Sequence, residues 1–317
     1  MRAIVLPRFG GPELFQVQDV PAPTPGPGQV LVRVVASGTN PVDAKLRHDG
    51  TWAGLKPPVV LGYDASGVVE QVGPGVTDFK AGDEVFYTPE IFGNPLGTYA
   101  ELNVVGVGIL ARKPPSLSHE EAAAVPLAGG TAWDAVVRRL QVRVGETVLI
   151  HGGAGGVGSF AVQLAKAMGA RVLATSGPGN LELLRKLGAD LAIDYQQEDV
   201  AQVALRETGG QGVDAVFDTV GKNIIPSIPA TRRYGRLATI LDVVGDVSGL
   251  YPRNQTLHGV FLDRERRRLE ELSVLIERRQ LRPVVAEVLP LERVADAHRR
   301  LDSGHGRGKV VLTVAQR

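Results

Sequence analysis

Residues 147–166 read Thr-Val-Leu-Ile-His-Gly-Gly-Ala-Gly-Gly-Val-Gly-Ser-Phe-Ala-Val-Gln-Leu-Ala-Lys. An apolar run typical of a strand comes first, then a glycine-rich turn, then a pattern typical of a helix. The turn contains G-x-G-x-x-G, and this spacing between a strand and a helix indicates a dinucleotide-binding loop. A glycine-rich turn could occur in any α/β protein, but this context favours the cofactor interpretation. The predicted contact residues are Gly153, Ala154, Gly155, Gly156, Val157 and Gly158.

Each glycine of the motif has an expected role. The first should allow the tight turn, the second should let the pyrophosphate approach the backbone, and the third should let the helix pack closely on the strand. Free N–H groups at the start of the helix, together with the positive end of its dipole, would hold the phosphates.

From about residue 145 the sequence alternates between strand and helix patterns. Strands are predicted at 146–151, 171–176, 191–194, 213–218, 235–241 and 257–262. Helices are predicted at 157–168, 180–187 and 198–207, and Pro226 and Pro229 make a fourth helix doubtful. Unbroken apolar strands that alternate with helices predict an α/β fold with a doubly wound, six-stranded parallel sheet.

Residues 1–115 show a different pattern. Strand-like runs such as 29–35 and 67–72 are separated by turns rich in proline and glycine, which predicts a mostly antiparallel β-domain. The end of the chain predicts helices at 265–279 and about 291–302, then a strand at 309–314. We expect that last strand to return to the N-terminal β-domain, because the six-stranded sheet is already complete.

Two short patterns near the junction resemble helix N-termini. Ser118-His119-Glu120-Glu121 is a capping box, and Thr131-Ala132-Trp133-Asp134 resembles a second one.

Composition limits the class of protein. The 317 residues are 44% hydrophobic, which is enough for two cores. No apolar run approaches the roughly 18 residues needed to span a bilayer, and Pro7 and Arg8 interrupt the N-terminus before it could form a signal-peptide core. The 35 basic and 34 acidic residues nearly cancel, so we expect no nucleic-acid or membrane partner. The expected location is cytoplasmic.

Several segments carry a resemblance to a known family. The stretch 145–166 fits its signature throughout, and supporting segments are 62–69, 124–133, 217–221 and 307–312. The chain resembles the zinc-independent quinone oxidoreductase group of the medium-chain dehydrogenase/reductase superfamily. The resemblance implies a GroES-like catalytic domain at 1–120, a Rossmann domain at 121–262, and a return to the catalytic domain at 263–317. It also implies a cofactor cleft between the domains and a homodimer, in which we expect strand 257–262 to pair across a two-fold axis.

The resemblance also bears on metal binding. Zinc-containing members of the superfamily carry Cys, His and Glu where this chain has Asn40, Tyr63 and Asp64. The chain has no cysteine, and its six histidines are scattered, so we predict no metal site. Without a Lewis acid, reduction of an already activated acceptor is favoured over oxidation of simple alcohols.

Three residues are predicted catalytic from the resemblance. Asn40 matches the asparagine beside the nicotinamide and substrate, although it could be only a turn former ahead of Pro41. Thr131 would contact the edge of the nicotinamide, unless it only caps a helix. Tyr63 would face the cleft, where it either donates a hydrogen bond to a substrate oxygen or fills the vacated metal position.

The predicted cofactor is NADPH. An NAD enzyme places a carboxylate near the end of the second Rossmann strand, where this chain has Thr175-Ser176-Gly177. Ser176 is the expected hydrogen-bond donor, and Tyr195 matches a tyrosine that reaches the 2′-phosphate in similar enzymes. Those enzymes often have a lysine in this loop, which this chain lacks, and loose specificity is the alternative. Val220, Ile240 and Phe261 are further predicted cofactor contacts.

These predictions together indicate hydride transfer from NADPH to a quinone, with Tyr63 or water as the proton source. Two alternatives stay open. One is reduction of an activated double bond in an enone, an enal or an enoyl thioester. The other is a low-turnover, NADPH-binding crystallin-like or regulatory protein, which only measured turnover would distinguish.

Overall fold

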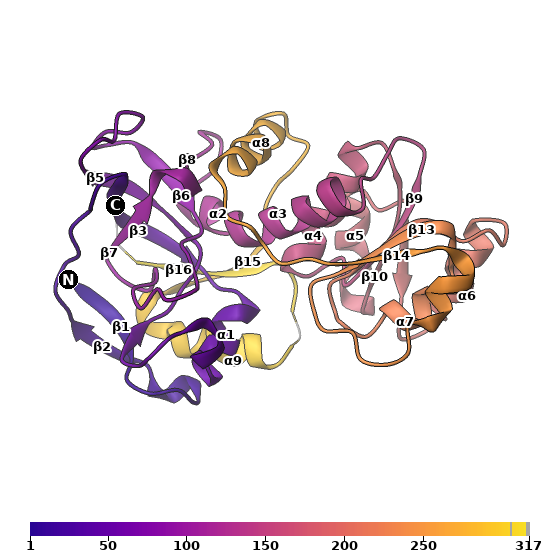
Figure 1. Cartoon of the computed structure of the whole chain (residues 1–317), viewed down its shortest axis with the longest axis horizontal. Helices are drawn as coiled ribbons and strands as arrows, with labels where there is room; N and C mark the ends of the chain where they lie inside the picture. Colours follow the sequence, from indigo (N-terminus) through magenta and orange to yellow (C-terminus); the bar gives the residue numbers. More distant parts are fainter. Residues whose placement is uncertain (305, 315–317) are drawn as a thin grey trace. The chain divides into compact units, whose positions relative to one another are not determined.

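A computed structural model describes residues 1–304 and 306–314 as two compact units. Unit 1 holds Met1–Ala128, Asp263–Arg279 and the described residues from Pro283 onward. Unit 2 holds Gly129–Leu262 and Gln280–Arg282. Figure 1 shows the elements of both units, coloured along the chain.

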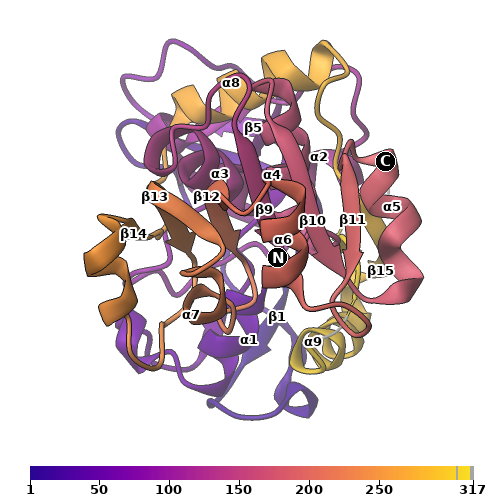
Figure 2. The same ribbon diagram turned by 90° about the vertical axis from the view of Figure 1, so that its right-hand side faces the viewer.

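Unit 2 is built on a six-stranded sheet in which every pair is parallel. The strand order is β11-β10-β9-β12-β13-β14, as Figure 2 shows. The bounds are β9 (Thr147–His151), β10 (Arg171–Ser176), β11 (Leu191–Asp194), β12 (Val213–Asp218), β13 (Thr231–Thr239) and β14 (Thr256–Gly259). The predicted doubly wound sheet is therefore confirmed.

Apolar strands hold this sheet in the interior of unit 2. Leu149, Leu173 and Val216, on three neighbouring strands, are fully buried in one hydrophobic cluster. Burial on both faces explains why these strands are almost continuously apolar in sequence. The helices of the unit are α4 (Gly156–Ala167), α5 (Leu181–Lys186), α6 (Val200–Glu207) and the short α7 (Ile224–Ser227), which contains Pro226.

Two strands differ from their predicted bounds. β13 begins at Thr231, earlier than predicted, because Thr231 pairs with Val213 before an irregularity shifts the register. β14 ends at Gly259 rather than at 262, and it lies at the edge of the sheet with a partner on one side only. Pairing of this edge with a second copy stays a prediction.

Unit 1 contains a seven-stranded sheet of order β15-β16-β3-β5-β6-β8, with β7 also paired to β3. Its bounds are β3 (Gln29–Gly38), β5 (Ala65–Val72), β6 (Glu84–Tyr87), β7 (Leu102–Gly106), β8 (Leu110–Arg112), β15 (Val285–Pro290) and β16 (Lys309–Thr313). A smaller sheet, β2-β1-β4, comprises β1 (Arg2–Leu6), β2 (Gln16–Asp19) and β4 (Val59–Val60). All of these pairs are antiparallel except β15 with β16.

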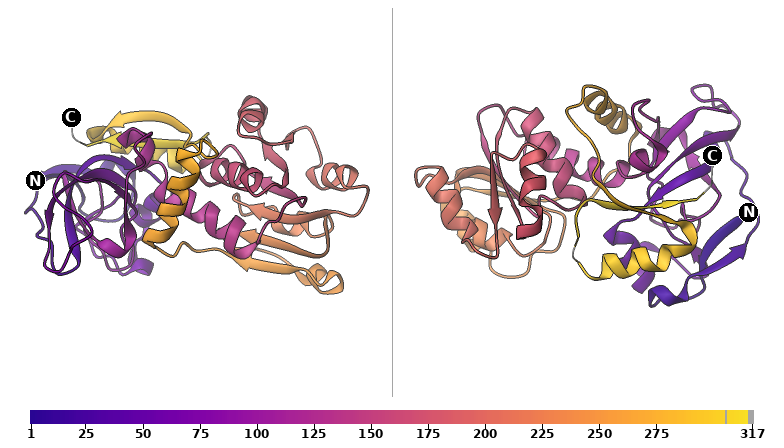
Figure 3. Two further views of the ribbon diagram at one scale, coloured as in Figure 1. Left: turned by 90° about the horizontal axis from the view of Figure 1, so that it is seen from above. Right: turned by 180° about the vertical axis from the view of Figure 1, so that it is seen from behind.

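The last strand returns to the N-terminal β-structure, as expected. β16 pairs with β3, and Val311 lies opposite Gly38. Figure 3 shows the yellow C-terminal strands in the same sheet as the purple strands of unit 1. The sequence analysis missed β15, whose residues are mostly half-buried and lack a clear apolar alternation.

The longer helices of unit 1 are α1 (Pro41–His48), α2 (His119–Ala123), α8 (Arg266–Glu277) and α9 (Val294–Asp302), and α3 (Pro126–Trp133) begins there. The 3-10 helices of the chain are η1 (Pro12–Leu14), η2 (Thr51–Ala53), η3 (Val107–Ile109), η5 (Pro178–Asn180), η6 (Ser248–Arg253) and η7 (Leu291–Arg293). Within the described ranges, no helix combines the length and the apolar character that a membrane span requires.

One of the two predicted caps is correct. The capping box at Ser118 is confirmed, because Glu121 N–H donates to the Ser118 hydroxyl at 3.2 Å and Ser118 N–H donates to the Glu121 carboxylate at 2.9 Å. The cap predicted at Thr131 is wrong. Thr131 lies inside α3, which continues into a π-helical segment, η4 (Asp134–Arg139). Helical residues therefore lie on both sides of Thr131, from Pro126 before it to Arg139 after it.

A glycine fixes the packing of α2 on the sheet. A Cβ atom on Gly38, at the end of β3, would lie 2.2 Å from the carbonyl oxygen of Ala123, at the end of α2. We expect Gly38→Ala to lower the free energy of unfolding by about 1–3 kcal/mol, because backbone must move to relieve the clash. Urea unfolding measures this change. The matched control is Gly106→Ala, where a Cβ meets nothing within 4 Å. Equal stabilities of the two variants would contradict the argument.

Candidate active site and cofactor loop

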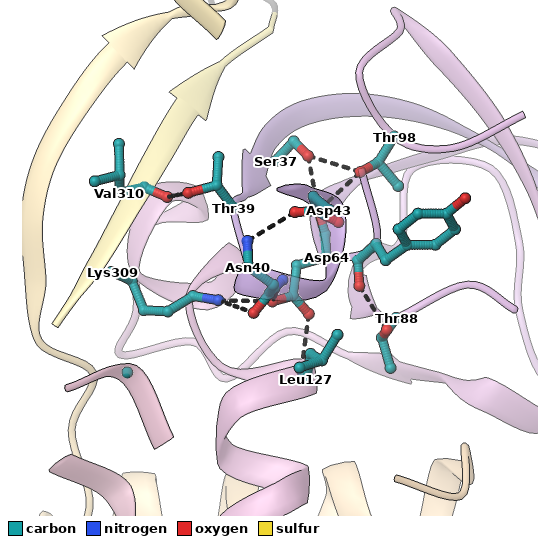
Figure 4. A network of polar contacts seen from close by, with 12 residues as sticks. Ser37, Thr39, Asn40, Asp43, Asp64, Thr88, Thr98, Leu127, Lys309 and Val310 are labelled. Atoms are coloured by element: carbon teal, nitrogen blue, oxygen red, sulfur yellow. Dashed lines mark hydrogen bonds and ion pairs between the residues drawn. The ribbon is translucent and has the colours of Figure 1, made fainter. Parts of the chain in front are cut away.

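A buried polar network in unit 1 surrounds Asn40 (Figure 4). The Asn40 side-chain amide donates to Asp64 Oδ2 at 2.9 Å, and Asn40 Oδ1 accepts a hydrogen bond from the Lys309 ammonium. Lys309 Nζ also lies 3.2 Å from Asp64 Oδ2. All three side chains are almost completely buried. The network therefore fixes both ends of the Asn40 amide.

The sheet of unit 1 brings these three distant residues together. Asn40 follows β3 and Asp64 precedes β5, and Ser37 and Ala65 lie opposite each other in that antiparallel pair. Lys309 begins β16, which pairs with the end of β3. Hydrogen bonds from Thr39 Oγ1 to the Val310 carbonyl (2.9 Å) and from Leu127 N–H to Asp64 Oδ1 (2.8 Å) complete the frame.

The electrostatic balance of the network depends on Lys309. Burial raises the pKa of the Asp64 carboxyl, while the Lys309 charge and the hydrogen bond from Asn40 act in the opposite direction. Isolated buried charges are strongly unfavourable, and an ion pair with further hydrogen bonds offsets much of that cost. Removing either partner would leave the other charge buried without compensation.

Tyr63 is the only one of the predicted catalytic residues whose side chain ends in an unsatisfied polar atom. Its ring is fully buried, and its hydroxyl has no hydrogen-bond partner among the described residues. Its carbonyl oxygen accepts a hydrogen bond from Thr88 Oγ1 at 2.5 Å, which holds the backbone. Burial raises the pKa of the phenol, against the influence of the nearby Arg264 charge. Tyr63 is thus a neutral donor with no acceptor in the described part of the chain.

Lys309 and Asp43 were not predicted as site residues. Lys309 was quoted only as part of a family segment, although a lysine at the start of an otherwise apolar strand is itself a signal. Asp43 follows Asn40 by three residues, and its carboxylate accepts the Asn40 N–H at 2.7 Å. That arrangement resembles half of a capping box, so sequence alone gives it a structural interpretation.

The predicted cofactor loop of unit 2 connects β9 to α4. Residue Gly152 has a φ of 71°, so the left-handed turn lies there and not at Gly153, the first glycine of the motif. A Cβ on Gly153 would instead lie 2.9 Å from Leu184 and 3.0 Å from Ala174. Close packing against these neighbouring elements is what excludes a side chain at Gly153, within the turn.

The other two glycines of the motif differ from each other. A Cβ on Gly158 would lie 2.1 Å from the Gly152 carbonyl oxygen, which allows the helix to pack closely on the loop. A Cβ on Gly155 would meet only that same oxygen, at 3.4 Å. Space next to Gly155 is therefore open, at the N-cap of a 12-residue helix whose first N–H groups lack intrahelical acceptors. This arrangement fits a bound pyrophosphate.

The end of β10 holds the loop and contains the predicted specificity residues. Thr175 accepts hydrogen bonds from Gly153 N–H at its carbonyl (2.9 Å) and from Gly152 N–H at its hydroxyl (3.2 Å). Ser176 is buried and donates to the Gly177 carbonyl at 3.1 Å. Tyr195 is 52% exposed, and its hydroxyl lies 4.0 Å from the Cβ position of Gly177. Tyr195 therefore reaches the turn that follows β10.

The remaining predicted cofactor contacts follow the carboxyl ends of three strands. Val220 comes after β12, Ile240 directly after β13, and Phe261 after β14. The carboxyl ends of parallel strands share one edge of the sheet, where doubly wound folds bind ligands. Asp218 shapes the turn at Val220 by accepting the Val220 N–H at 2.8 Å. Thr131 lies on α3, in unit 2.

The residues at the metal-ligand positions do not fit zinc. Asn40 and Asp64 bind the Lys309 ammonium, which places a cation against the carboxylate that a metal would need. Protein zinc is held mainly by thiolate, imidazole and carboxylate groups. Across the residues that the structure describes, no group of three or more His, Cys, Asp or Glu side chains could hold a metal ion.

Comparisons with known proteins agree with this architecture. Residues 26–115 match the family model described as alcohol dehydrogenase GroES-like domain, and residues 187–312 match the model described as zinc-binding dehydrogenase. A quinone oxidoreductase of Pseudomonas aeruginosa is 36% identical over 96% of this chain and 97% of its own length. The chloroplastic NADPH-dependent alkenal/one oxidoreductase of Arabidopsis thaliana is 35% identical over 98% of this chain and 79% of its own.

A solved structure described as an NAD-dependent alcohol dehydrogenase is 39% identical, with a TM-score of 0.93 over 99% of this chain and 100% of that one. Family members and relatives imply a nicotinamide cofactor. The family follows from three findings, which are the identity over the full length, the GroES-like domain and the six-stranded sheet. The chain is an oxidoreductase that belongs to the medium-chain dehydrogenase/reductase superfamily, in its quinone oxidoreductase group.

Proposed function

We propose that the protein catalyses the NADPH-dependent reduction of quinones by hydride transfer, without a metal ion. The observation that carries the proposal is the Tyr63 hydroxyl, which is buried, neutral and without an acceptor among the residues that the structure describes. Reduction of a conjugated carbonyl places negative charge on its oxygen, and a positioned neutral donor stabilises that charge. Relatives named as quinone oxidoreductases support the choice of acceptor.

Different residues of the chain would bind the cofactor, position polar groups and donate a hydrogen bond to the acceptor. The glycine loop and the first turn of α4 would bind the pyrophosphate, and the bound cofactor supplies the hydride. Asn40, held at its oxygen by Lys309 and at its amide by Asp64, keeps one orientation and presents a rigid polar surface. Tyr63 would donate a hydrogen bond to the acceptor oxygen. Positioning and electrostatics are what such an enzyme contributes.

Reduction of activated double bonds is the second candidate. The relative named as an NADPH-dependent alkenal/one oxidoreductase favours it, because that protein matches nearly the whole of this chain. The same donor arrangement would stabilise an enolate oxygen. A low-turnover binding protein is the third alternative, and it requires the cofactor loop but no reaction.

An acceptor panel separates these functions. Quinones, enals and enones are each offered with NADPH and with NADH, and the loss of reduced-nicotinamide absorbance is measured. We expect the largest kcat/KM with quinones and NADPH, because the acceptor is already activated and needs no Lewis acid. Faster reduction of enals or enones would replace the proposed substrate class. Cofactor binding without turnover of any acceptor would favour the binding protein.

The glycine loop allows a clean test of cofactor binding. Gly155→Val places a side chain in the open space beside the loop, and its extended backbone, with φ −73° and ψ 179°, accommodates valine. We expect a loss of about 100-fold or more in cofactor affinity, since the phosphate contacts at the helix N-terminus no longer form. Titration by cofactor fluorescence measures the affinity. Unchanged affinity in a folded Gly155→Val protein would contradict the assigned loop.

Gly106→Val is the matched control for this experiment. A Cβ at that position meets nothing within 4 Å, and the residue lies in unit 1 at the end of β7. The control should bind the cofactor as the unchanged protein does. Far-UV circular dichroism and thermal unfolding of both variants distinguish lost binding from lost folding.

Cofactor preference is tested at Tyr195. The end of β10 carries no carboxylate, and the Tyr195 hydroxyl reaches the following turn, where a 2′-phosphate would lie. We expect NADPH to bind more tightly than NADH, and Tyr195→Phe to weaken NADPH by about 10-fold while leaving NADH unchanged. Tyr234→Phe, at another exposed tyrosine, is the control. Equal or tighter binding of NADH to the unchanged protein would contradict the preference.

A further inference from the structure

The side-chain amide of Asn40 has a fixed donor end and a fixed acceptor end. Lys309 can only donate hydrogen bonds, so the Asn40 atom that contacts its ammonium must be Oδ1. Asp64 accepts a hydrogen bond from the other end, Nδ2, at 2.9 Å. If the two ends were exchanged, an N–H group would face the ammonium and Oδ1 would face the carboxylate. In this arrangement, drawn in Figure 4, the charged partners exclude the alternative orientation of the amide.

The same contacts decide which of the two amide hydrogens Asp64 receives. Lys309 Nζ bonds Asn40 Oδ1 and lies 3.2 Å from Asp64 Oδ2, so the three groups form a closed ring. An amide group is planar, and only the hydrogen on the side of Oδ1 can point to an acceptor that lies so close to Nζ. An acceptor of the other hydrogen would lie roughly 5–6 Å from Nζ. The hydrogen on the Cβ side of Nδ2 is therefore outside the ring.

This Cβ-side hydrogen of Asn40 has no acceptor among the described residues. The hydrogen bond that Asn40 Nδ2 makes within them goes to Asp64. Asn40 as a whole is only 2% exposed. A nearly buried N–H group without an acceptor is unfavourable, and a polar ligand that supplied an acceptor would remove that cost. The hydrogen is therefore available to a ligand.

The backbone on both sides of this contact is also held. Asn40 N–H donates to Asp43 Oδ2 at 2.7 Å, where Asn40 is the N-cap of α1. Lys309 N–H donates to the Val284 carbonyl oxygen at 2.8 Å, and a Cβ on Gly308 would lie 2.1 Å from that same oxygen. The start of β16 is therefore closely packed, and the Lys309 ammonium reaches Asn40 from a fixed position.

We propose that Lys309 is a positioning residue of the site. By occupying Asn40 Oδ1, it commits the Asn40 amide to donate its Cβ-side hydrogen to the oxygen of the acceptor, as that oxygen gains negative charge. The inference rests on the proposed function, which supplies the acceptor. A fixed donor stabilises developing charge better than a mobile one, because no reorganisation is needed during the reaction. Lys309 acts only through Asn40.

Nuclear magnetic resonance on protein labelled at the asparagine nitrogens tests the orientation without turnover. The Asn40 signals are identified by their loss in Asn40→Ser, and the stronger nuclear Overhauser effect from the Asn40 β-protons marks the Cβ-side hydrogen. We expect the Oδ1-side hydrogen to lie at lower field than in an exposed asparagine, because it is bonded to a carboxylate, and the Cβ-side hydrogen to be unshifted. Absence of that shift, or a shift of the Cβ-side hydrogen instead, would overturn the inference.

Addition of ligands tests the contact with the acceptor. NADP+ is added first and duroquinone second, a mixture that cannot react because it contains no hydride donor. We expect the Cβ-side hydrogen of Asn40 to move to lower field when the quinone joins the NADP+ complex, while the Oδ1-side hydrogen stays in place. A change on addition of NADP+ that the quinone does not increase would identify the cofactor as the ligand of Asn40, and would contradict the proposed contact.

Lys309→Met tests the positioning role in turnover, since it removes the ammonium and keeps an unbranched side chain. Asp64 keeps the Asn40 and Leu127 donors. Burial raises the pKa of its carboxyl, and without the opposing Lys309 charge the carboxyl takes up a proton more readily. A protonated carboxyl donates as well as accepts, so both orientations of the Asn40 amide become possible. We expect kcat with quinones to fall about 10- to 100-fold, with a smaller change in KM and unchanged cofactor affinity.

Lys113→Met is the matched control. Lys113 is also buried in unit 1, and its ammonium also lies 3.2 Å from a carboxylate, that of Glu84. Its printed partners are Glu84 and the carbonyl oxygens of Pro114 and Leu117, all outside the Asn40 network. The control should keep kcat and the Asn40 signals. Thermal unfolding shows whether both variants are folded at the assay temperature.

The outcomes separate this inference from the proposed function. Unchanged kcat in a folded Lys309→Met protein, or an equal loss of kcat in Lys113→Met, would overturn the inference and leave the proposed function intact. Absence of turnover with every acceptor would overturn both. The two resonance experiments use the unchanged protein, so they decide the question even where Lys309→Met does not fold.

Discussion

The buried contact between Lys309 and Asp64 is the interaction on which the polar network of unit 1 depends. It joins the start of the last strand to the segment before β5, and the Asn40 amide bonds to both of its members. A buried charge pair tolerates little displacement, because loss of either partner leaves a desolvated charge. β16 must therefore pair with β3 in one register, and Asn40 has one orientation. The constraint links the end of the chain to its first forty residues.

Much of the fold follows from local patterns in the sequence. Six apolar strands separated by helical stretches predict the parallel sheet of unit 2, because strands buried on both faces leave a continuous apolar signal. The Ser118 capping box is also local, since both of its hydrogen bonds join residues three apart. β15 gave no such signal, because its residues are mostly half-buried and show no clear apolar alternation. The cap predicted at Thr131 was wrong for a different reason. The tetrapeptide that resembles a cap lies inside a helical segment that extends beyond it on both sides.

The residues of the candidate site lie farther apart in the sequence than the residues that determine each helix and strand. Asn40 and Tyr63 were predicted from resemblance, but Lys309 acts across 269 positions and no spacing rule connects it to Asn40. The glycine loop shows the same limit at short range. Its motif predicts a phosphate-binding turn, yet the left-handed residue is Gly152, which precedes the motif. Close packing against Ala174 and Leu184, both outside the loop, explains the glycine at 153. The sequence pattern therefore predicts the secondary-structure element, whereas contacts with residues outside that element explain why a given residue type is required at a position.

Asp43 and Asp64 show how one residue type takes two roles within one network. Asp64 has an ammonium ion, a side-chain amide and a backbone N–H among its partners, and each of these three favours its charged form against the effect of burial. Within the described ranges, Asp43 has two neutral donors on Oδ2 and none on Oδ1. The two carboxylates are equally buried, but their hydrogen-bond and ion-pair partners differ. Asp64 is paired directly with the Lys309 ammonium and holds the frame, whereas Asp43 has no direct ion pair among the described residues and burial raises the pKa of its carboxyl to about 7.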